Sequence, residues 1–238
     1  MERKTLRLTA LLVLLTAFQH LRAQQTQQIN VVTTAVPFLR ISPDARAGGM
    51  GDLGVATSPD ANSSFYNQAK TPFAEKNFSL GLTYTPWLKD LGLNDVYLMA
   101  LAGYYKLDDQ QALTASVRYF SLGNITFSDY NGTILGDFKP REMGIDFGYS
   151  RKLSDKMGLG LALRYINSNL VGGGISQGGT SYKAGSAVSG DLSLFYTGVN
   201  DVGQGWNFGA AITNLGTKIG YTNDATQKDY IPANLSVG

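Results

Sequence analysis

The chain contains no cysteine and only one histidine, His20, which lies within the first 23 residues. Those residues have the features of a secretory leader, so we expect the mature chain to hold neither residue type. Their absence excludes Ser-His-Asp and Cys-His catalytic arrangements, histidine-ligated zinc, haem held by histidine and disulfides. We therefore predict that the protein is not an enzyme and that it has no metal site and no cofactor.

Charge is also scarce in this sequence. Charged residues make up 16% of the 238 residues, and the net charge is +2, whereas a soluble domain usually carries about 25% charged residues. This balance leaves no basic patch, so we expect no nucleic-acid partner. Glycine is plentiful, at 28 residues, and 11% of the chain is aromatic. Such a composition is typical of a β protein whose outer surface does not face water.

The N-terminus has the layout of a signal peptide. Three basic residues lie in the first seven positions, and an apolar run from Leu8 to Phe18 follows them. This run is too short to cross a bilayer, which takes about 20 residues. We predict a signal peptide over residues 1–23, cleaved after Ala23; an uncleaved N-terminal anchor is the alternative. No later stretch has the 18 or so apolar residues in succession that would predict a transmembrane helix.

From residue 77 onward, apolar residues alternate with small or polar ones. In residues 158–166, Leu159, Leu161 and Leu163 share one face, and glycine, alanine and Arg164 share the other. A period of two predicts strands with one face in apolar surroundings. Six segments show the alternation and a seventh is apolar on both faces: 78–84, 113–119, 143–150, 158–166, 188–196, 206–213, and 95–106.

A soluble β-sandwich would show the same alternation, but three features favour a transmembrane barrel. The strands run about 10 to 12 residues, as a tilted transmembrane strand requires, whereas soluble strands average about 5 to 6. Aromatic residues gather near strand ends, where interfacial girdles lie. Long connections (86–94, 124–141, 169–185, 215–232) alternate with short ones (107–111, 153–157, 198–204), like the extracellular loops and periplasmic turns of outer-membrane barrels. We predict an all-β fold, an antiparallel transmembrane barrel of the outer membrane, over residues 77–238.

The last residues resemble the opening of one more strand. Residues 231–238 follow the last long loop and stop after a few apolar positions. Bacterial barrels have even strand counts and no free edge. Seven strands and the start of an eighth do not close, so we expect the chain to be part of a longer barrel.

Residues 24–76 differ from the rest and contain the Ser-Pro-Asp-Ala sequence twice, at 42–45 and 58–61. In each copy we expect the serine to cap a short helical turn whose first position is the proline. We predict a compact plug-like segment inside the barrel mouth; an extension packed outside the barrel is the alternative.

Four charged residues fall on the small, polar face of consecutive predicted strands: Arg118, Asp146, Arg164 and Asp191. Asp146 and Arg164 are equidistant from the centre of a short turn, and Arg118 and Asp146 are equidistant from residue 132, beside a favourable Asn-Gly pair. Arg164 and Asp191 are symmetric about the next loop. Directly opposed residues lie about 4.5 to 5.5 Å apart, so these four residues form a candidate charge ladder; separate solvation in a wet lumen is the alternative.

At this point the sequence resembles a known family. The run from Ala35 to Gly51 and the segment 61–67 look like the start of PorV (LptO) proteins, outer-membrane components of the type IX secretion system of Bacteroidota, related to FadL-like barrels. Segments 124–127, 182–187 and 211–216 are similar to that family as well. Family members have about fourteen strands, typical of outer-membrane barrels.

The resemblance implies a role in protein transport. PorV-like proteins associate with a large translocon barrel (SprA- or Sov-like), accept the C-terminal signal domains of secreted cargo, and deliver cargo to a surface attachment complex with a sortase-like protease. We expect the loops 124–141 and 169–185 to form the contact surface, with Tyr130 and Tyr182 as candidate aromatic anchors, and outer-membrane lipid around the barrel. The alternative is a FadL-type transporter of hydrophobic small molecules, for which the polar faces offer little apolar lining.

Overall fold

The computed structural model describes residues 33–128, 131–171, 176–177, 180–200, 202–224 and 226–238. The predicted signal peptide lies outside these residues. The chain divides into residues 1–33 and 34–238, and the second unit is described below.

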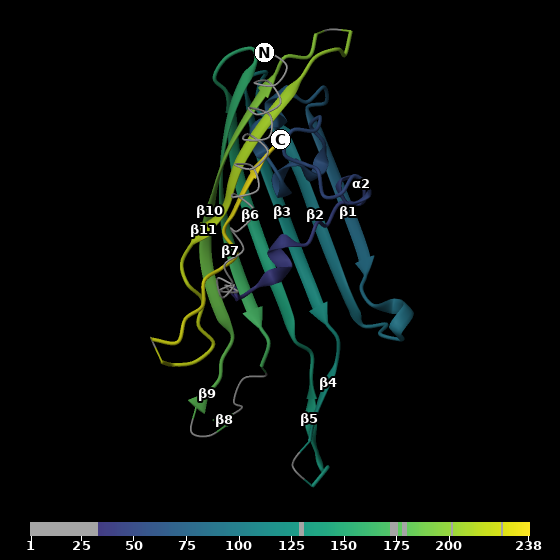
Figure 1. Ribbon diagram of the computed structural model, residues 1–238, viewed down its shortest axis with the longest axis vertical. Coiled ribbons are helices and arrows are strands. Elements are labelled where there is room, and N and C mark those ends of the chain that lie inside the picture. Colours follow the sequence, from purple (N-terminus) through teal and green to yellow (C-terminus); the bar gives the residue numbers. More distant parts are fainter. Residues whose placement is uncertain (1–32, 129–130, 172–175, 178–179, 201, 225) are drawn as a thin grey trace, which may run out of the picture. The chain divides into compact units, whose positions relative to one another are not determined.

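Eight antiparallel strands form one large sheet (Figure 1). The strands follow one another across the sheet in chain order: β1 (Phe78–Pro86), β2 (Val96–Lys106), β3 (Gln111–Leu122), β6 (Arg141–Lys152), β7 (Met157–Asn169), β10 (Gly185–Thr197), β11 (Asn207–Gly216) and β12 (Asn234–Val237). The predicted all-β, antiparallel class is confirmed. Among the described residues no strand joins β1 to β12, so the sheet is not closed.

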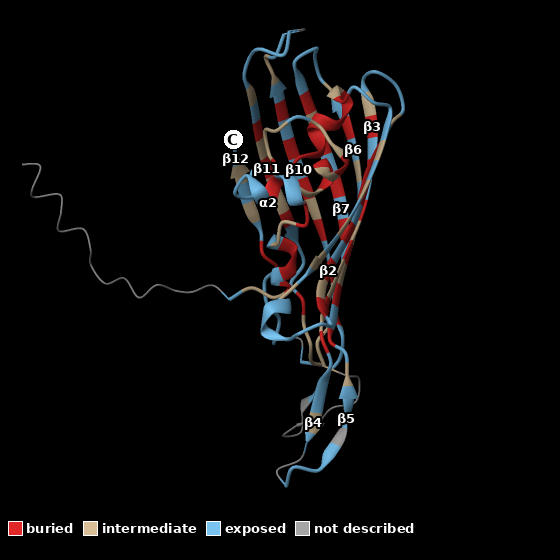
Figure 2. Cartoon of the chain, turned by 90° about the vertical axis from the view of Figure 1, so that its right-hand side faces the viewer, coloured by how far each residue is buried: buried red, intermediate tan, exposed pale blue. Residues whose placement is uncertain are grey.

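The two faces of the sheet differ in exposure, as the alternation predicts. In β7, Leu161 is 52% exposed and its neighbour Ala162 only 8% exposed. Figure 2 shows the same alternation of buried and exposed residues along the other strands. We call the face of Ala162 and Arg164 the inner face, and the face of Leu161 and Leu163 the outer face. Large apolar side chains therefore cover the exposed outer face, whereas the inner face is buried.

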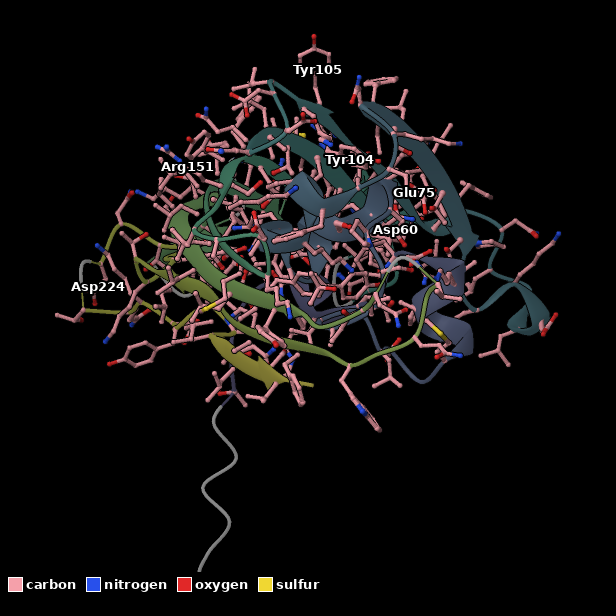
Figure 3. The ribbon with its side chains drawn as sticks, turned by 90° about the horizontal axis from the view of Figure 1, so that it is seen from above. Asp60, Glu75, Tyr104, Tyr105, Arg151 and Asp224 are labelled. Carbon is pink, nitrogen blue, oxygen red and sulfur yellow. The ribbon has the colours of Figure 1, made fainter. Side chains whose placement is uncertain are left out.

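Residues 34–76 cover the inner face, and Figure 3 shows the sheet curving around them. They form four short helices: η2 (Pro37–Arg40), α2 (Ala45–Gly49), η3 (Ala61–Phe65) and η4 (Gln68–Phe73). η3 contacts β1, β2 and β3, and η4 contacts β6, β7 and β10. These contacts explain why β2 is apolar on both faces, since its inner face packs against helices. Within the described residues, no helix is long and apolar enough to cross a membrane.

The two Ser-Pro-Asp-Ala repeats do begin helices, but the capping residue differs from the expectation. The N-caps are Asp44 and Asp60, one position after each proline. Asp44 accepts hydrogen bonds from the backbone N–H groups of Arg46 and Ala47, at 3.0 and 3.1 Å. Asp60 forms a capping box with Ser63. A carboxylate accepts two N–H groups at once and favours the positive end of the helix, so it replaces the serine as the cap.

Glycines of β7 let η4 approach the sheet closely. A Cβ atom on Gly158 would lie 2.3 Å from the carbonyl oxygen of Ala69, and one on Gly160 would lie 2.7 Å from the Ala69 nitrogen. Any side chain at these positions would therefore push η4 away. Nearby, the Thr71 and Ser150 hydroxyls are 2.8 Å apart and hydrogen-bonded.

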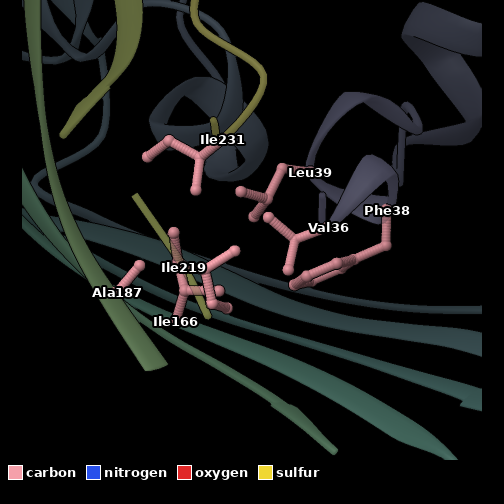
Figure 4. Close-up of a cluster of buried hydrophobic side chains, with 7 residues drawn as sticks. All are labelled: Val36, Phe38, Leu39, Ile166, Ala187, Ile219 and Ile231. Atoms are coloured by element: carbon pink, nitrogen blue, oxygen red, sulfur yellow. The ribbon is translucent and has the colours of Figure 1, made fainter. Parts of the chain in front are cut away.

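An apolar cluster anchors the start of this segment (Figure 4). Its buried members come from η2, from the inner face of β7 and β10, and from the loop before β12: Val36, Phe38, Leu39, Ile166, Ala187, Ile219 and Ile231. Burying an isoleucine or phenylalanine side chain stabilises a fold by about 1.5–3 kcal/mol. The cluster therefore fastens the segment to the sheet independently of its polar contacts.

The long connections contain further structure that the sequence reading treated as loop. Residues 124–141 hold a hairpin, β4 (Ile125–Ser128) with β5 (Ile134–Phe138), and residues 169–185 hold a two-residue pair, β8 (Ser176–Gln177) with β9 (Thr180–Ser181). The loop after β1 contains η5 (Lys89–Leu91). Figure 1 shows both hairpins extending from the same end of the sheet, opposite the short turns.

Candidate functional site

Arg164 occupies the centre of a buried polar network on the inner face. It is 2% exposed and lies between two buried carboxylates. Its Nε atom pairs with Asp146, and its Nη2 atom lies 2.9 Å from the Asp191 carboxylate. Ser116 donates a hydrogen bond to Asp146 at 3.0 Å. The single cation thus holds two anions that would otherwise be unpaired in a dry interior.

Asn214 completes this network from β11. Its backbone N–H donates to Asp191 at 2.7 Å, its side-chain oxygen accepts from Arg164, and its amide nitrogen donates to the Pro232 carbonyl at 3.0 Å. The pairing of β10 with β11 is shifted between Gly190 and Leu192, which places an extra residue in β11 there. Such a bulge turns an outward position inward, and Asn214 adopts a positive φ of 60°, which asparagine tolerates.

The predicted register is correct at one pair and shifted by two residues at the others. Asp146 lies directly opposite Arg164. Arg118, however, lies opposite Gly144, and Asp191 lies opposite Ala162. Asp191 still reaches its expected partner Arg164 diagonally, at 2.9 Å, whereas Arg118 forms no ion pair with Asp146 in the described structure. The reason is loop length: a short turn fixes the register, whereas a long loop does not. A shift of two keeps every side chain on its face.

Arg118 does not join the charge ladder as an ion pair. Its Nη1 atom donates to the Leu39 carbonyl at 2.8 Å, and its guanidinium lies 5.0 Å from the centre of the Phe65 ring. Both contacts come from the helical segment, which the strand pattern alone does not place. Arg118 therefore ties residues 34–76 to the sheet instead of pairing with Asp146.

The helical segment carries its own buried cation. Lys70, on η4, is almost fully buried, and its Nζ donates to the Gly54 carbonyl at 2.8 Å and to the Thr57 hydroxyl at 3.0 Å. Burial lowers the pKa of Lys70 to about 8. Burial also raises the pKa of Tyr66 to about 12, because a low-polarity surrounding disfavours both charged forms.

A cavity of about 700 Å³ lies between the helical segment and the strands β11 and β12. Its lining is mixed: Leu53, Val55 and Tyr66 from the segment, Arg118 from β3, and Leu235 from β12. Among the described residues, no group of three or more histidine, cysteine or acidic side chains could hold a metal ion.

The structure describes one of the two candidate loop tyrosines, Tyr182. Tyr182 is half-buried and forms a β-bridge with Thr222, which joins the long loop 169–185 to the long loop 215–232. The neighbouring Lys183 donates its backbone N–H to the Tyr221 carbonyl at 2.8 Å. Tyr130 lies outside the described residues. Tyr182 thus has a structural contact of its own, and its role as an anchor stays a prediction.

Sequence reasoning missed three members of the inner-face contacts. Ser116 lies on the predicted polar face but carries no charge, Asn214 depends on a bulge, and Lys70 lies on a helix. The alternation itself pointed to Ser116, because it occupies the same face as Arg118. No sequence signal reveals the bulge at Asn214.

Comparison with known proteins identifies the family. The model of the type IX secretion system protein PorV matches residues 23–238, which is nearly the whole chain. No curated protein matches the sequence. The structure described above has an eight-stranded antiparallel sheet, a buried network on its inner face and a helical segment that covers that face. The chain with this structure therefore belongs to the PorV family of type IX secretion system proteins.

Proposed function

We propose that this protein is an outer-membrane barrel component that binds the C-terminal signal domains of secreted cargo and passes cargo from the type IX translocon to the surface attachment complex. The observation that carries the proposal is the arrangement of the long connections. The hairpins β4–β5 and β8–β9 extend from one end of a rigid sheet, away from the short turns (Figure 1). Binding residues concentrate on such loops.

The two faces of the sheet support a membrane location for this activity. The outer face is apolar and exposed along its strands, as a lipid-facing surface must be. The inner face is closed by helices 34–76, which we propose act as a plug. In the buried network Arg164 is paired with both Asp146 and Asp191, and arginine keeps its proton in proteins, so we favour binding over catalysis.

The hairpin β4–β5 is the best candidate for the contact surface. This hairpin projects beyond the end of the sheet, and its side chains Ile125 and Ile134 are both exposed. Exposed apolar side chains on a projecting hairpin are typical of protein-binding sites. We place the cargo or translocon contact on this hairpin and on the loop 169–185.

Deleting the gene and measuring surface proteins tests the proposal. We expect cargo to accumulate in the periplasm with uncleaved C-terminal signal domains. Shortening 124–141 or 169–185 should reproduce part of this defect while the protein still inserts into the outer membrane. Shortening the loop 86–94, at the same end of the sheet, is the matched control and should have a smaller effect.

One observation favours a second function, the FadL-type transport of hydrophobic small molecules. The cavity of about 700 Å³ beside Arg118 lies within the range of ligand pockets, about 300–1,000 Å³. If deletion leaves surface cargo unchanged but lowers uptake of a fatty acid or an aromatic compound, the transporter reading replaces the secretion reading.

A further inference from the structure

The outer face of the sheet is not uniformly bulky. One row of directly paired residues crosses seven strands: Leu80, Gly103, Ala115, Phe147, Leu163, Gly190 and Leu215. Three members of this row are small, whereas Phe147 and Leu163 are 68% and 69% exposed. The row therefore forms a ridge at Phe147 and Leu163, with a depression on each side.

Two apolar grooves occupy these depressions. The first, of about 440 Å³, has Gly103 and Ala115 in its lining, and the second, of about 650 Å³, has Gly190. Both grooves are also lined by Leu113 and Phe147. They adjoin one another on either side of the Phe147 side chain.

A cation lies in line with the point where the grooves meet. Arg151 follows Phe147 and Tyr149 on the outer face of β6, about 13 Å from Phe147 at 3.3 Å per residue. It is exposed, and Figure 3 shows its side chain pointing away from the sheet. Its cross-strand neighbours, Gln111 and Leu159, are uncharged. The fully exposed Asp108, in the adjoining turn, is an acidic group that interacts with it.

We propose that the outer face of β3, β6 and β7 binds one two-chained anionic phospholipid, with its phosphate at Arg151 and one acyl chain in each groove beside Phe147. The inference rests on the proposed membrane location. Arg151 lies near the short-turn end of β6, where an interfacial arginine meets lipid headgroups. Tyr149, which lines the second groove and lies between Arg151 and Phe147 on β6, has the position of an interfacial aromatic ring.

The chemistry of the grooves favours lipid over a protein segment. Their walls are leucine, phenylalanine, valine and tyrosine rings or chains, which offer few hydrogen-bond partners. A polypeptide backbone entering them would leave its N–H and C=O groups unpaired, at a cost of several kcal/mol each. An acyl chain has no such groups and packs against the groove walls by van der Waals contact alone.

Native mass spectrometry of the detergent-purified protein tests the proposal. The added probes are phosphatidylglycerol, phosphatidylcholine of the same acyl chains, single-chain lysophosphatidylglycerol, and inorganic phosphate. We expect one tightly bound phosphatidylglycerol, favoured over phosphatidylcholine by about fivefold, since a surface cation contributes about 1 kcal/mol. The single-chain lipid should bind about tenfold more weakly, since half of the acyl contacts with the grooves are lost.

Variants separate the headgroup contact from the grooves. Arg151→Gln should abolish the headgroup preference, whereas Arg141→Gln, an exposed arginine at the opposite end of β6, should keep it. Ala115→Leu and Gly190→Leu should each lower lipid affinity by about tenfold or more by filling one groove. Gly190 has room for a Cβ atom, whose nearest neighbour would be 3.6 Å away. Ala210→Leu, on the outer face of β11, is the matched control.

Three results would overturn the inference. The first is unchanged lipid binding in both groove variants, provided that they fold as judged by heat-dependent gel mobility. The second is an Arg151→Gln variant that still prefers phosphatidylglycerol. The third is inorganic phosphate that competes as well as the lipid, which would indicate a phosphate site only. If the protein inserts into membranes and exports cargo but binds no phosphatidylglycerol, this inference fails while the proposed function stands.

Discussion

Replacing Arg164 with methionine tests the buried network directly. Methionine keeps most of the side-chain volume and removes the charge. The change leaves Asp146 and Asp191, which are about 2–4% exposed and lie on the strands either side of β7, without their shared cation. Buried carboxylates without a partner are strongly unfavourable.

The magnitude follows from the geometry. At the 2.9 Å separation of Arg164 and Asp191, one pair attracts by roughly 6 kcal/mol with an effective dielectric constant of about 20. Desolvation of each ion costs several kcal/mol, so the intact network contributes little net stability. Removing only the cation is different, because the desolvation cost remains. We expect Arg164→Met to lower the free energy of unfolding by about 3–5 kcal/mol.

A neutral triple variant separates charge from packing. Arg164→Met combined with Asp146→Asn and Asp191→Asn should recover most of the loss, because asparagine still accepts the hydrogen bonds of Ser116 and of the Asn214 backbone. The measurement is urea unfolding in detergent micelles, followed by tryptophan fluorescence and extrapolated linearly to zero urea. Lys156→Met, at an exposed short turn, is the control and should change little.

The reasoning is refuted if Arg164→Met costs less than about 1 kcal/mol, the range of exposed ion pairs. It is also refuted if the triple variant is as unstable as the single one, since the loss would then come from packing.

Three further perturbations probe the sheet faces, the helical segment and its buried lysine. Leu161→Arg should cost about 2–4 kcal/mol if the outer face meets lipid, and Ala162→Ser far less; equal losses in urea unfolding from lipid vesicles would contradict the assignment of faces. Gly158→Ala should cost about 1–3 kcal/mol, because its Cβ would overlap the η4 backbone, whereas Gly190→Ala should be tolerated; faster hydrogen exchange in η4 of the first variant alone is the expected signature. For Lys70, the pKa of about 8 in the folded protein lies below the unfolded value of 10.5. Between these pH values the unfolded chain binds more protons at Lys70 than the folded one, so the free energy of unfolding rises from pH 8 to pH 10, by about 2 kcal/mol. Lys70→Met should flatten this slope in urea titrations at several pH values, and a slope that persists would assign it to another group.

The sequence predicted the strands well because their signal is local. Each large strand has one face in apolar surroundings, so the two-residue period appears without knowledge of its neighbours. Leu161 and Ala162 illustrate this: their alternation alone assigned them to opposite faces, and their exposures differ accordingly. The short turn between β6 and β7 likewise fixed the pairing of Asp146 with Arg164.

The caps of the helical segment show where local reasoning becomes incomplete. The repeated Ser-Pro-Asp-Ala sequence located both helix starts, but serine and aspartate are each good caps. The choice of Asp60 depends on Ser63 and on Arg46, whose Nη1 lies 2.7 Å from the Asp60 carboxylate. Arg46 lies on α2, the helix that begins at the other repeat, so the contact between the two helix starts is a tertiary one.

Residues 77–238 alone determined an antiparallel sheet with an apolar outer face and a polar inner face, since both follow from residue type and period. The short turn also paired Asp146 with Arg164, and only the tertiary structure decided the other partners of the buried charges. Long loops fix no register, so Arg118 lies opposite Gly144 and donates to Leu39, and a bulge brings Asn214 to Arg164. Leu39 and Asn214 are distant in sequence from the arginines that they contact, and residues 34–76, which bring Leu39 to Arg118, show no hydrophobic period from which their packing could be predicted.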